Sequence, residues 1–308
     1  MSESLKPPAS FSATDAGLSG FRILRERPTI WPAWAIASLA ISIAMVVPMV
    51  IFAGPAIAEF QQLGRSGAPD PDALVALYGR IAPAMLIVLP ISLVFYAVIY
   101  AAANRVVLRP QAGGFGWFRF GSDEVRQGLV LLLSFAVILG VTFAVTLAST
   151  LLIGLASVIS PVLGGLVGFL AFFGMIGAIF YVGVRLSLLS PLAFVTGRVD
   201  LREAWRLSKG RFTAMLGAFV LAIVLAMIIG VIGAGVFFLV AMPIFGLGDT
   251  AKVVFEPDMT SMATMFPPVG IAYYIWQCII TGVTSVVTSV VAPTIYQQVT
   301  EGQPAVFD

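Results

Sequence analysis

Six long apolar stretches limit most strongly what this sequence can fold into. They run over Ile30–Phe60, Ile81–Ala103, Gly128–Ser157, Val162–Val184, Phe212–Phe245 and Val269–Val291. A helix needs about 20 apolar residues to cross a bilayer, because each residue adds about 1.5 Å of length. Every stretch meets this requirement. We therefore predict an all-α, polytopic integral membrane bundle, with all 308 residues in one transmembrane domain.

The scarcity of charge supports this fold class. Hydrophobic residues make up 59% of the chain and charged residues 10%, whereas soluble domains carry about 25% charged residues. A soluble fold could not cover its surface with so few charges. The segment Ala56-Ile57-Ala58 resembles a signal-peptide cleavage site, but the apolar run around it far exceeds the core of a signal peptide, which is about 7–15 residues long. We predict an uncleaved first helix.

The positions of the basic residues predict the orientation. Fourteen would lie on one side of the membrane: Lys6, Arg22, Arg25, Arg27, Arg105, Arg109, Arg119, Arg126, Arg185, Arg198, Arg202, Arg206, Lys209 and Arg211. Only Arg65, Arg80 and Lys252 would lie on the other. Lys and Arg near helix ends accumulate in the cytoplasm. We predict a multi-pass protein of the bacterial inner membrane with both termini cytoplasmic.

Residues 197–211, before the fifth stretch, predict an interfacial helix. Asp200 and Glu203 have the spacing of a capping box. In the helix that follows, Leu201, Ala204, Trp205 and Ser208 would share one face, and Arg202, Arg206 and Lys209 another. Such a helix suits the lipid headgroup boundary. We take Arg185, Arg202, Trp205, Arg206, Lys209 and Arg211 as candidate contacts to anionic lipids or to a partner.

The N-terminal segment has a similar pattern. Residues 21–27 (FRILRER) and 205–211 (WRLSKGR) share the order aromatic, basic, aliphatic, variable, basic, variable, basic. Arg22 and Arg25 therefore join the candidate lipid contacts, within a cytoplasmic tail and interfacial helix over residues 1–28. A weaker version precedes the third span, where Ser122 is a candidate cap and Asp123 and Glu124 would face the positive end of the helix dipole. Three parallel hairpin repeats are one explanation, and the general preference for basic and aromatic residues before outward spans is the other.

The residues that most enzymes require are missing from this sequence. There is no histidine and only one cysteine, Cys278. This removes most metal sites and most general-base schemes, and no aspartate falls within a predicted span. No nucleotide-binding motif is present. The basic residues lie at helix–membrane boundaries, where topology explains them without a nucleic acid. We expect no catalysis, no metal and no cofactor.

A few residues within the spans have two interpretations each. Arg185 follows the fourth span, and the apolar stretch after it is expected to run along the interface. Arg185 is then either a snorkelling anchor or a tie to a lipid phosphate or to one of four acids, namely Asp123, Glu124, Asp200 and Glu203. Asn104 and Gln277 predict hydrogen bonds between helices. Gly164 and Gly168, Gly174 and Gly177, and the group Gly230, Gly233 and Gly235 predict close helix packing, with a homodimer seam or a hinge as alternatives.

One segment resembles a known family. Residues 185–197 (RLSLLSPLAFVTG) and 201–212 (LREAWRLSKGRF) resemble the membrane domain of glycerophosphoryl diester phosphodiesterases and its stand-alone bacterial relatives. The resemblance implies about six spans, a cytoplasmic proline-containing stretch after the fourth span and a lipid-related setting. It does not imply hydrolysis, because this chain has neither the attached catalytic domain nor a histidine.

These observations favour a non-enzymatic scaffold or accessory factor in envelope or lipid homeostasis. Its expected partners are anionic membrane lipids, with a second copy of the chain or another membrane protein left open. A transporter for an apolar or amphiphilic solute is the alternative. Glycines and prolines within the spans favour a transporter, whereas the lack of buried charge and of an inverted repeat argues against one.

Overall fold

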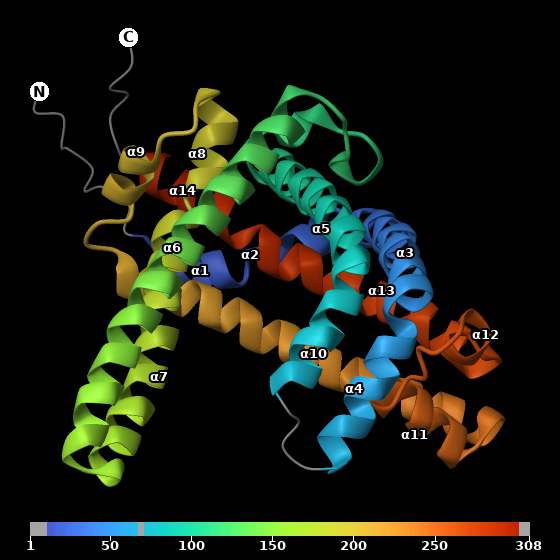
Figure 1. Cartoon of the computed structure of the whole chain (residues 1–308). Coiled ribbons are helices and arrows are strands. Elements are labelled where there is room, and N and C mark those ends of the chain that lie inside the picture. The colour runs from blue at the N-terminus through green and yellow to red at the C-terminus, as the bar shows by residue number, and fades with distance from the viewer. Residues whose placement is uncertain (1–10, 67–70, 302–308) are drawn as a thin grey trace, which may run out of the picture.

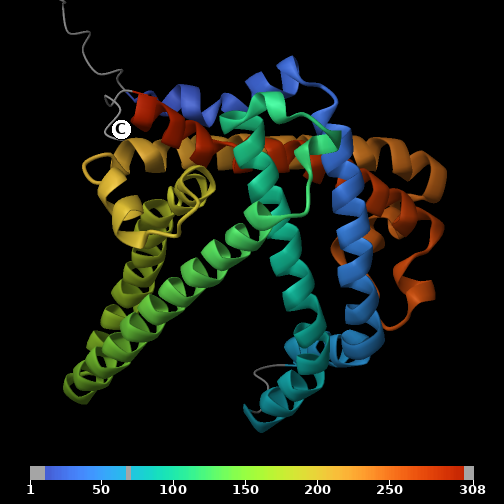
Figure 2. The ribbon, with the colours of Figure 1, turned by 90° about the horizontal axis from the view of Figure 1, so that it is seen from above.

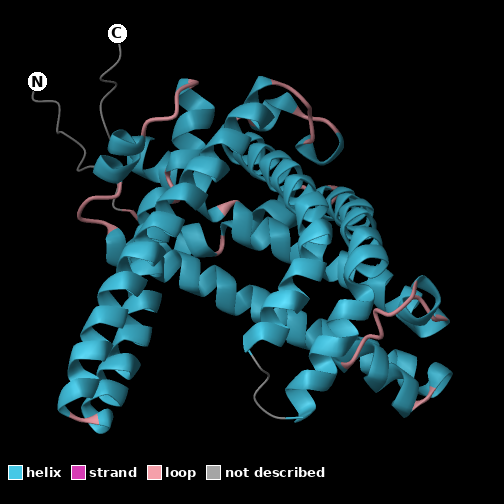
Figure 3. Cartoon of the chain, viewed as in Figure 1, coloured by secondary structure: helices cyan, strands magenta, loops and turns pink. Residues whose placement is uncertain are grey.

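The computed structural model of the chain describes residues 11–66 and 71–301. Within these residues the protein is all-α, with no strand (Figure 3). The long helices are α3 (Ile30–Pro48), α5 (Pro71–Leu108), α6 (Ser122–Ile159), α7 (Pro161–Leu186), α10 (Phe212–Phe245) and α13 (Pro268–Ser289). The shorter ones are α1 (Ala13–Gly17), α2 (Ser19–Glu26), α4 (Gly54–Ser66), α8 (Leu189–Thr196), α9 (Leu201–Leu207), α11 (Leu247–Phe255), α12 (Met262–Met265) and α14 (Val291–Glu301).

Six helical segments in the described part of the chain are long and apolar enough to cross a membrane. They are Ile30–Phe60, Leu74–Leu108, Ser122–Ile159, Pro161–Thr196, Phe212–Phe245 and Pro268–Thr300. These segments identify a multi-pass membrane protein and confirm the predicted fold class. Several extend beyond the apolar stretches seen in the sequence, because polar first and last turns continue the same helices.

The first span contains a break in its helical pattern. The α-helix α3 ends at Pro48, and a π-helical turn, η1 (Met49–Ala53), follows before α4 begins at Gly54. Proline has no backbone N–H and crowds the turn before it, so Pro55, the second residue of α4, interrupts the hydrogen-bond ladder at η1. A π-type turn is one way for a helix to absorb such an interruption.

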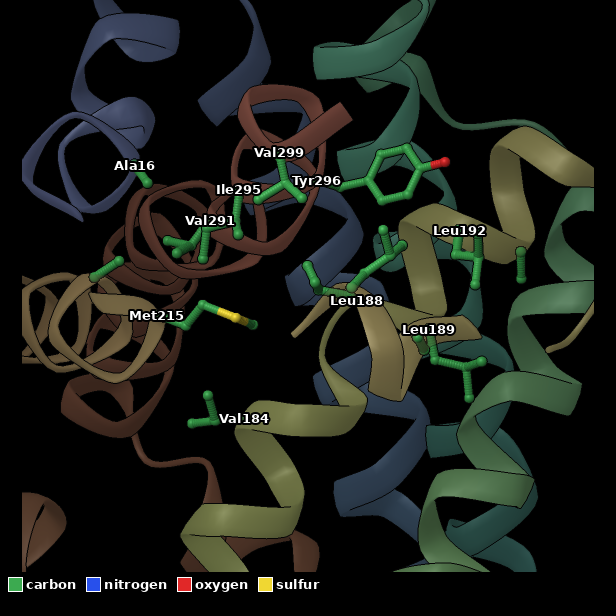
Figure 4. Packing of buried hydrophobic residues seen from close by; sticks show 14 of the residues in the cluster. Ala16, Val184, Leu188, Leu189, Leu192, Met215, Val291, Ile295, Tyr296 and Val299 are labelled. Carbon is green, nitrogen blue, oxygen red and sulfur yellow. The ribbon is translucent and has the colours of Figure 1, made fainter. Parts of the chain in front are cut away.

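One hydrophobic core joins the ends of most helices at the same side of the bundle. Ala16 of α1, Val184 at the end of α7, Met215 at the start of α10 and Ile295 of α14 are all buried there (Figure 4). The helices α8 and α9 contribute Leu188, Leu189, Leu192, Ala204 and Leu207. The two described ends of the chain, α1 and α14, contact each other here. The spans therefore alternate in direction as six crossings require.

A second core lies beside the first and holds α2, α3, α5 and the end of α13 together. Trp34 is fully buried in it, and its indole Nε1 donates a hydrogen bond to the Gly116 carbonyl at 3.0 Å. Gly116 belongs to the short 3-10 turn η3 (Phe115–Trp117) in the loop between α5 and α6. This core therefore ties the second inter-span loop to the first span.

The hairpin of α6 and α7 extends away from the rest of the bundle at its outer end (Figures 1 and 2). The most apolar part of each helix has only 6% of its residues buried. Leu147, Leu155, Leu170 and Phe173 are among the exposed apolar side chains of this hairpin. Its outer half therefore presents apolar surface to the bilayer, while its other end is built into the first core.

Residues 186–195 were expected to run along the interface, and the structure buries most of them within the protein. They end α7 and form most of α8, in which Leu189, Leu192, Ala193 and Phe194 are no more than 4% exposed. The helix α8 packs against α5, α6 and α14. Most of its side chains are apolar, and Ser190 is hydrogen-bonded to Asn104 and Gln127, so burial within the protein removes apolar surface without leaving this hydroxyl unpaired.

The glycines divide into packed and unpacked positions. Gly164 packs against Ser157 of α6, and Gly233 packs against Ile280 of α13. At Gly174, Gly177, Gly230 and Gly235, by contrast, an added Cβ would meet nothing within 4 Å. The closest approaches to backbone lie elsewhere. An added Cβ would clash with the Met259 carbonyl at Gly54 and with Cα of Val287 at Gly20, and a Cβ on Gly282 would lie 2.7 Å from N of Ala35.

Candidate functional site

Arg185 connects the end of α7 to α9 through neutral groups. Its Nη1 donates to the Trp205 carbonyl at 3.4 Å and to Ser208 Oγ at 3.3 Å, and its Nη2 donates to the Tyr181 hydroxyl at 3.2 Å. The guanidinium carbon lies 5.3 Å from the ring centroids of both Tyr181 and Trp205. Cation–π attraction and three long hydrogen bonds thus hold the side chain in place.

The predicted pairing of Arg185 with an acid was wrong. Among the described residues no carboxylate lies within ion-pair distance of it, and the four acids considered have other roles. Asp200 caps α9, where its Oδ1 accepts from the Glu203 N–H at 3.0 Å. Glu203 pairs with Arg206 at 2.8 Å. The Arg185 charge is therefore not neutralised by the protein part that the structure describes.

The amphipathic pattern predicted for α9 is present, but the protein itself covers the apolar face. Ala204, Leu207 and Ser208 are buried, and α9 packs on α7. Trp205 is 38% exposed. Because the buried face is used for tertiary packing, only Trp205 and the basic side chains remain at the surface to meet lipid.

The basic candidate residues of this region differ in their exposure and in their interactions. Arg202, Arg206 and Lys209 are exposed, and of these Arg206 is paired with Glu203. The Nη1 of Arg211 donates to the Leu207 carbonyl at 3.2 Å, which fastens the end of α9. Arg202 and Arg206 lie on α9 and Lys209 follows it, and Trp205 of the same helix contacts Arg185.

The helix α2 is built in the same way. Ser19, Gly20 and Ile23 are buried against the bundle, whereas Arg22 and Arg25 are exposed. The close contact of Gly20 with Val287 draws α2 onto the end of α13. Its cations therefore lie at the same end of the bundle as those of α9, although on a different helix.

No protein-family model, no curated protein and no solved structure matches this chain.

Sequence reasoning missed a buried charge cluster between α5 and α6. Arg105 of α5 is ion-paired with Glu124 of α6 at 2.5 Å and with Asp123 at 3.4 Å, and its Nη1 donates to the Trp117 carbonyl at 3.1 Å. Arg126 pairs with Asp123 at 3.1 Å. Arg105 had been counted only as a topology marker. The signal that could have found the cluster is the pair of acids at the start of α6, close in sequence to a basic residue in the last turn of α5.

The predicted cap of the third span also differs. Ser122 is the first residue of α6, and Gly121 is its N-cap with no side-chain hydrogen bond. Asp123 and Glu124 do occupy the first turn as predicted. They bind Arg105 as well as facing the helix dipole, which explains why Glu124 can be only 6% exposed.

Asn104 confirms one of the two predicted interhelical hydrogen bonds. Its Nδ2 donates to Ser190 Oγ of α8 at 3.0 Å. Ser190 in turn contacts Gln127 of α6 through two hydrogen bonds. The prediction for Gln277 was wrong, because its Nε2 donates to the Tyr273 hydroxyl of the same helix at 3.1 Å.

The opposite end of the bundle holds a pocket of 490 Å³ lined in part by Asp249, Lys252 and Asp258. The Asp258 carboxylate accepts hydrogen bonds from the N–H and the hydroxyl of Thr260, at 2.9 and 2.6 Å. These bonds hold the pKa of Asp258 below its usual value. Asp258 therefore shapes its own loop, which reduces its capacity to act as a free ligand.

Proposed function

We propose that this protein is a non-enzymatic accessory protein of envelope or lipid homeostasis that holds anionic lipid headgroups at its cytoplasmic face. The observation that carries the proposal is the uncompensated charge of Arg185 beside the exposed Arg202 and Lys209. A lipid phosphate would supply the missing counter-charge. Trp205 suits the same depth, since tryptophan favours the membrane–water interface.

The placement of this surface in the cytoplasm follows from the distribution of Lys and Arg, fourteen against three. Anionic lipids attract such residues with a free energy of about 1 kcal/mol per Lys or Arg near the surface. The resemblance of residues 185–212 to the membrane domain of glycerophosphoryl diester phosphodiesterases supports a lipid-related role. We extend the proposal to the bacterial inner membrane on the same grounds.

Lipid analysis of the purified protein tests this proposal. The wild type and the variant Arg185→Gln/Arg202→Gln/Lys209→Gln would be purified in parallel in a mild detergent, and their retained phospholipids quantified by mass spectrometry. We expect the variant to retain several-fold less anionic phospholipid, with zwitterionic lipid unchanged. Lys252→Gln, on the other side of the membrane, is the control and should retain wild-type amounts. Equal anionic lipid in all three proteins would refute the proposal.

A transporter for an amphiphilic solute is the second candidate, because a cavity of 550 Å³ lies between the hairpins. Flux measurements in proteoliposomes distinguish the transporter from the accessory protein. A cargo-dependent flux that requires the cavity-lining residues would favour transport. Retained lipid without flux favours the accessory role.

A further inference from the structure

A cavity of 550 Å³ lies among α5, α6, α8, α10 and the α13–α14 junction. It is separate from the basic surface at α9. Its size falls within the range of about 300–1,000 Å³ that is usual for small-molecule sites. Among the residues that the structure describes, none with a charged side chain lines it. An ionic ligand would therefore find no counter-charge in the walls of the cavity. An uncharged ligand would lose little hydration free energy on entering it.

The cavity has access to the bilayer. Three lining residues, Tyr96 of α5, Phe135 of α6 and Ile223 of α10, are between 44% and 64% exposed. They lie on membrane-spanning helices, so their exposed sides face hydrocarbon. A ligand that reaches the cavity by this route comes from the lipid phase and must itself be amphiphilic.

Asn104 is the most constrained polar group in the cavity wall. Its side chain is almost fully buried, and no hydrogen-bond donor in the described part of the chain reaches its Oδ1. The orientation of its amide follows from its neighbours. Gln127 Nε2 donates to the Ser190 carbonyl at 3.0 Å, so Gln127 Oε1 faces the Ser190 hydroxyl and accepts its hydrogen at 2.8 Å.

The Ser190 hydroxyl therefore has no hydrogen left for Asn104, and only the NH2 group of Asn104 can face it. The backbone carbonyl of Ser190 thus fixes the orientation of the Gln127 amide. Through the Ser190 hydroxyl, this orientation determines which end of the Asn104 amide stays unpaired. A buried acceptor without a donor is unfavourable. The oxygen has almost no accessible surface, so a ligand that brings a hydrogen-bond donor to it must first displace the Asn104 side chain slightly, and the new hydrogen bond would then remove that cost.

Two further hydroxyl groups of the wall, those of Ser187 and Thr288, also act as acceptors. Ser187 Oγ donates to the Val184 carbonyl at 2.8 Å, and Thr288 Oγ1 donates to the Thr284 carbonyl at 2.9 Å. Each hydroxyl spends its single hydrogen on its own helix backbone. These two hydroxyl groups are therefore available to a ligand in the cavity as hydrogen-bond acceptors. These two oxygens and Asn104 Oδ1 favour a ligand that carries hydroxyl donors.

A groove of 500 Å³ between α10 and α13 continues from this cavity, with which it shares Ile223, Ser285 and Thr288. Its α10 wall includes Ala226, Gly230 and Ala234. These residues are small, and a Cβ on Gly230 would meet nothing within 4 Å. The groove therefore has room for an elongated apolar chain beside the methyl groups of the α13 threonines.

We propose that the Asn104 cavity binds the uncharged, hydroxyl-bearing head of a lipid-phase amphiphile, whose hydrocarbon chain occupies the α10–α13 groove. A head hydroxyl donates to Asn104 Oδ1. Phosphate and carboxylate heads are disfavoured because no cation lines the site. Binding here does not depend on the anionic lipid surface around Arg185.

Photo-crosslinking of the full chain in phosphatidylcholine nanodiscs tests this site. The probe is monooleoylglycerol with a diazirine in its acyl chain, and crosslinked peptides are identified by mass spectrometry. We expect labelling of α10 and α13 along the groove. Excess unlabelled monooleoylglycerol should compete, whereas methyl oleate, which has no donor, and oleate, which is anionic, should compete poorly.

Two variants and a matched control complete the experiment. Asn104→Leu should lower the competable labelling about tenfold, as expected for one lost hydrogen bond to a buried acceptor. Ile223→Trp fills the junction of cavity and groove and should lower it at least as much. Val224→Trp adds the same bulk at the next residue, which is equally exposed (45% against 44%) but lines neither space, and labelling should be unchanged.

Three results would overturn the proposal. Equal labelling of Ile223→Trp and Val224→Trp would mean that the chain does not occupy the groove. Equal competition by methyl oleate would mean that no hydroxyl donor is recognised. Better competition by oleate would mean that the site prefers an anion. If Asn104→Leu does not fold, Ile223→Trp decides the location, because its site is half-exposed and outside the hydrogen-bond network of Asn104.

Discussion

Arg105 of α5 and Glu124 of α6 form an ion pair in which Nη2 and Oε1 are 2.5 Å apart and both side chains are less than 10% exposed. The pair joins the end of the second span to the start of the third. The remaining donors of Arg105 bind Asp123 and the Trp117 carbonyl, so the guanidinium also organises the loop between these spans.

We predict that Arg105→Met destabilises the protein strongly, because it leaves Glu124 buried without its cation. Removing one partner of a buried pair typically costs about 3–5 kcal/mol. Glu124→Gln should cost less, since Arg105 keeps Asp123. Thermal unfolding in detergent measures both. Arg206→Gln, which breaks an exposed pair, is the control and should change stability by about 1 kcal/mol or less. Wild-type stability of Arg105→Met would contradict the importance of the pair.

Arg185→Lys and Arg185→Ala should both lower the melting temperature of the detergent-purified protein. A lysine ammonium cannot reproduce the planar group that lies between Tyr181 and Trp205 while it donates to three oxygens. We expect a loss on the order of 1–2 kcal/mol for a half-exposed group with long hydrogen bonds. Arg202→Lys, at an exposed position of α9, should be silent. Unchanged melting temperature and lipid content in both Arg185 variants would leave only a snorkelling anchor.

Reporter fusions after Asp249 and at the C-terminus should report opposite sides of the membrane. Asp249 lies in α11, after the fifth span, and the C-terminus follows the sixth. The excess of Lys and Arg predicts that the C-terminal fusion is cytoplasmic. An alkaline phosphatase fusion active after Asp249 and inactive at the C-terminus is the expected pattern. Two fusions on the same side would mean that no crossing, or an even number of them, separates Asp249 from the C-terminus, which would contradict the sixth span.

Gly282→Ala should destabilise the contact between α13 and α3. An added Cβ would lie 2.7 Å from N and 2.9 Å from Cα of Ala35, and 2.8 Å from the Trp31 carbonyl oxygen. These are backbone atoms, so the two helices would have to separate, at a cost of about 1–3 kcal/mol. Gly177→Ala, in α7, has nothing within 4 Å of the new Cβ. It should be neutral or stabilising by up to about 1 kcal/mol, because alanine favours the helix. A melting temperature for Gly282→Ala at or above that of Gly177→Ala would contradict this account.

The fold class and the number of spans could be predicted from the order of the residues alone. Apolar length is a property of consecutive residues, and the cost of burying unpaired backbone groups in lipid leaves the helix as the structure such a segment adopts. The cap of α9 was predictable for the same reason, since Asp200 and Glu203 are three residues apart and interact locally.

Which polar groups meet could not be predicted, because it depends on how the helices pack. Arg105 and Glu124 lie on different helices, and Asn104 reaches Ser190 only because α8 folds into the bundle instead of running along the interface. The sequence also could not predict what covers the apolar faces of α2 and α9, because an apolar face can pack against lipid or against protein. The hydrophobic effect is non-directional, so it does not distinguish between these two surroundings. Which surface covers each face, and which acceptor remains unpaired in the Asn104 cavity, therefore depends on the packing of all six spans.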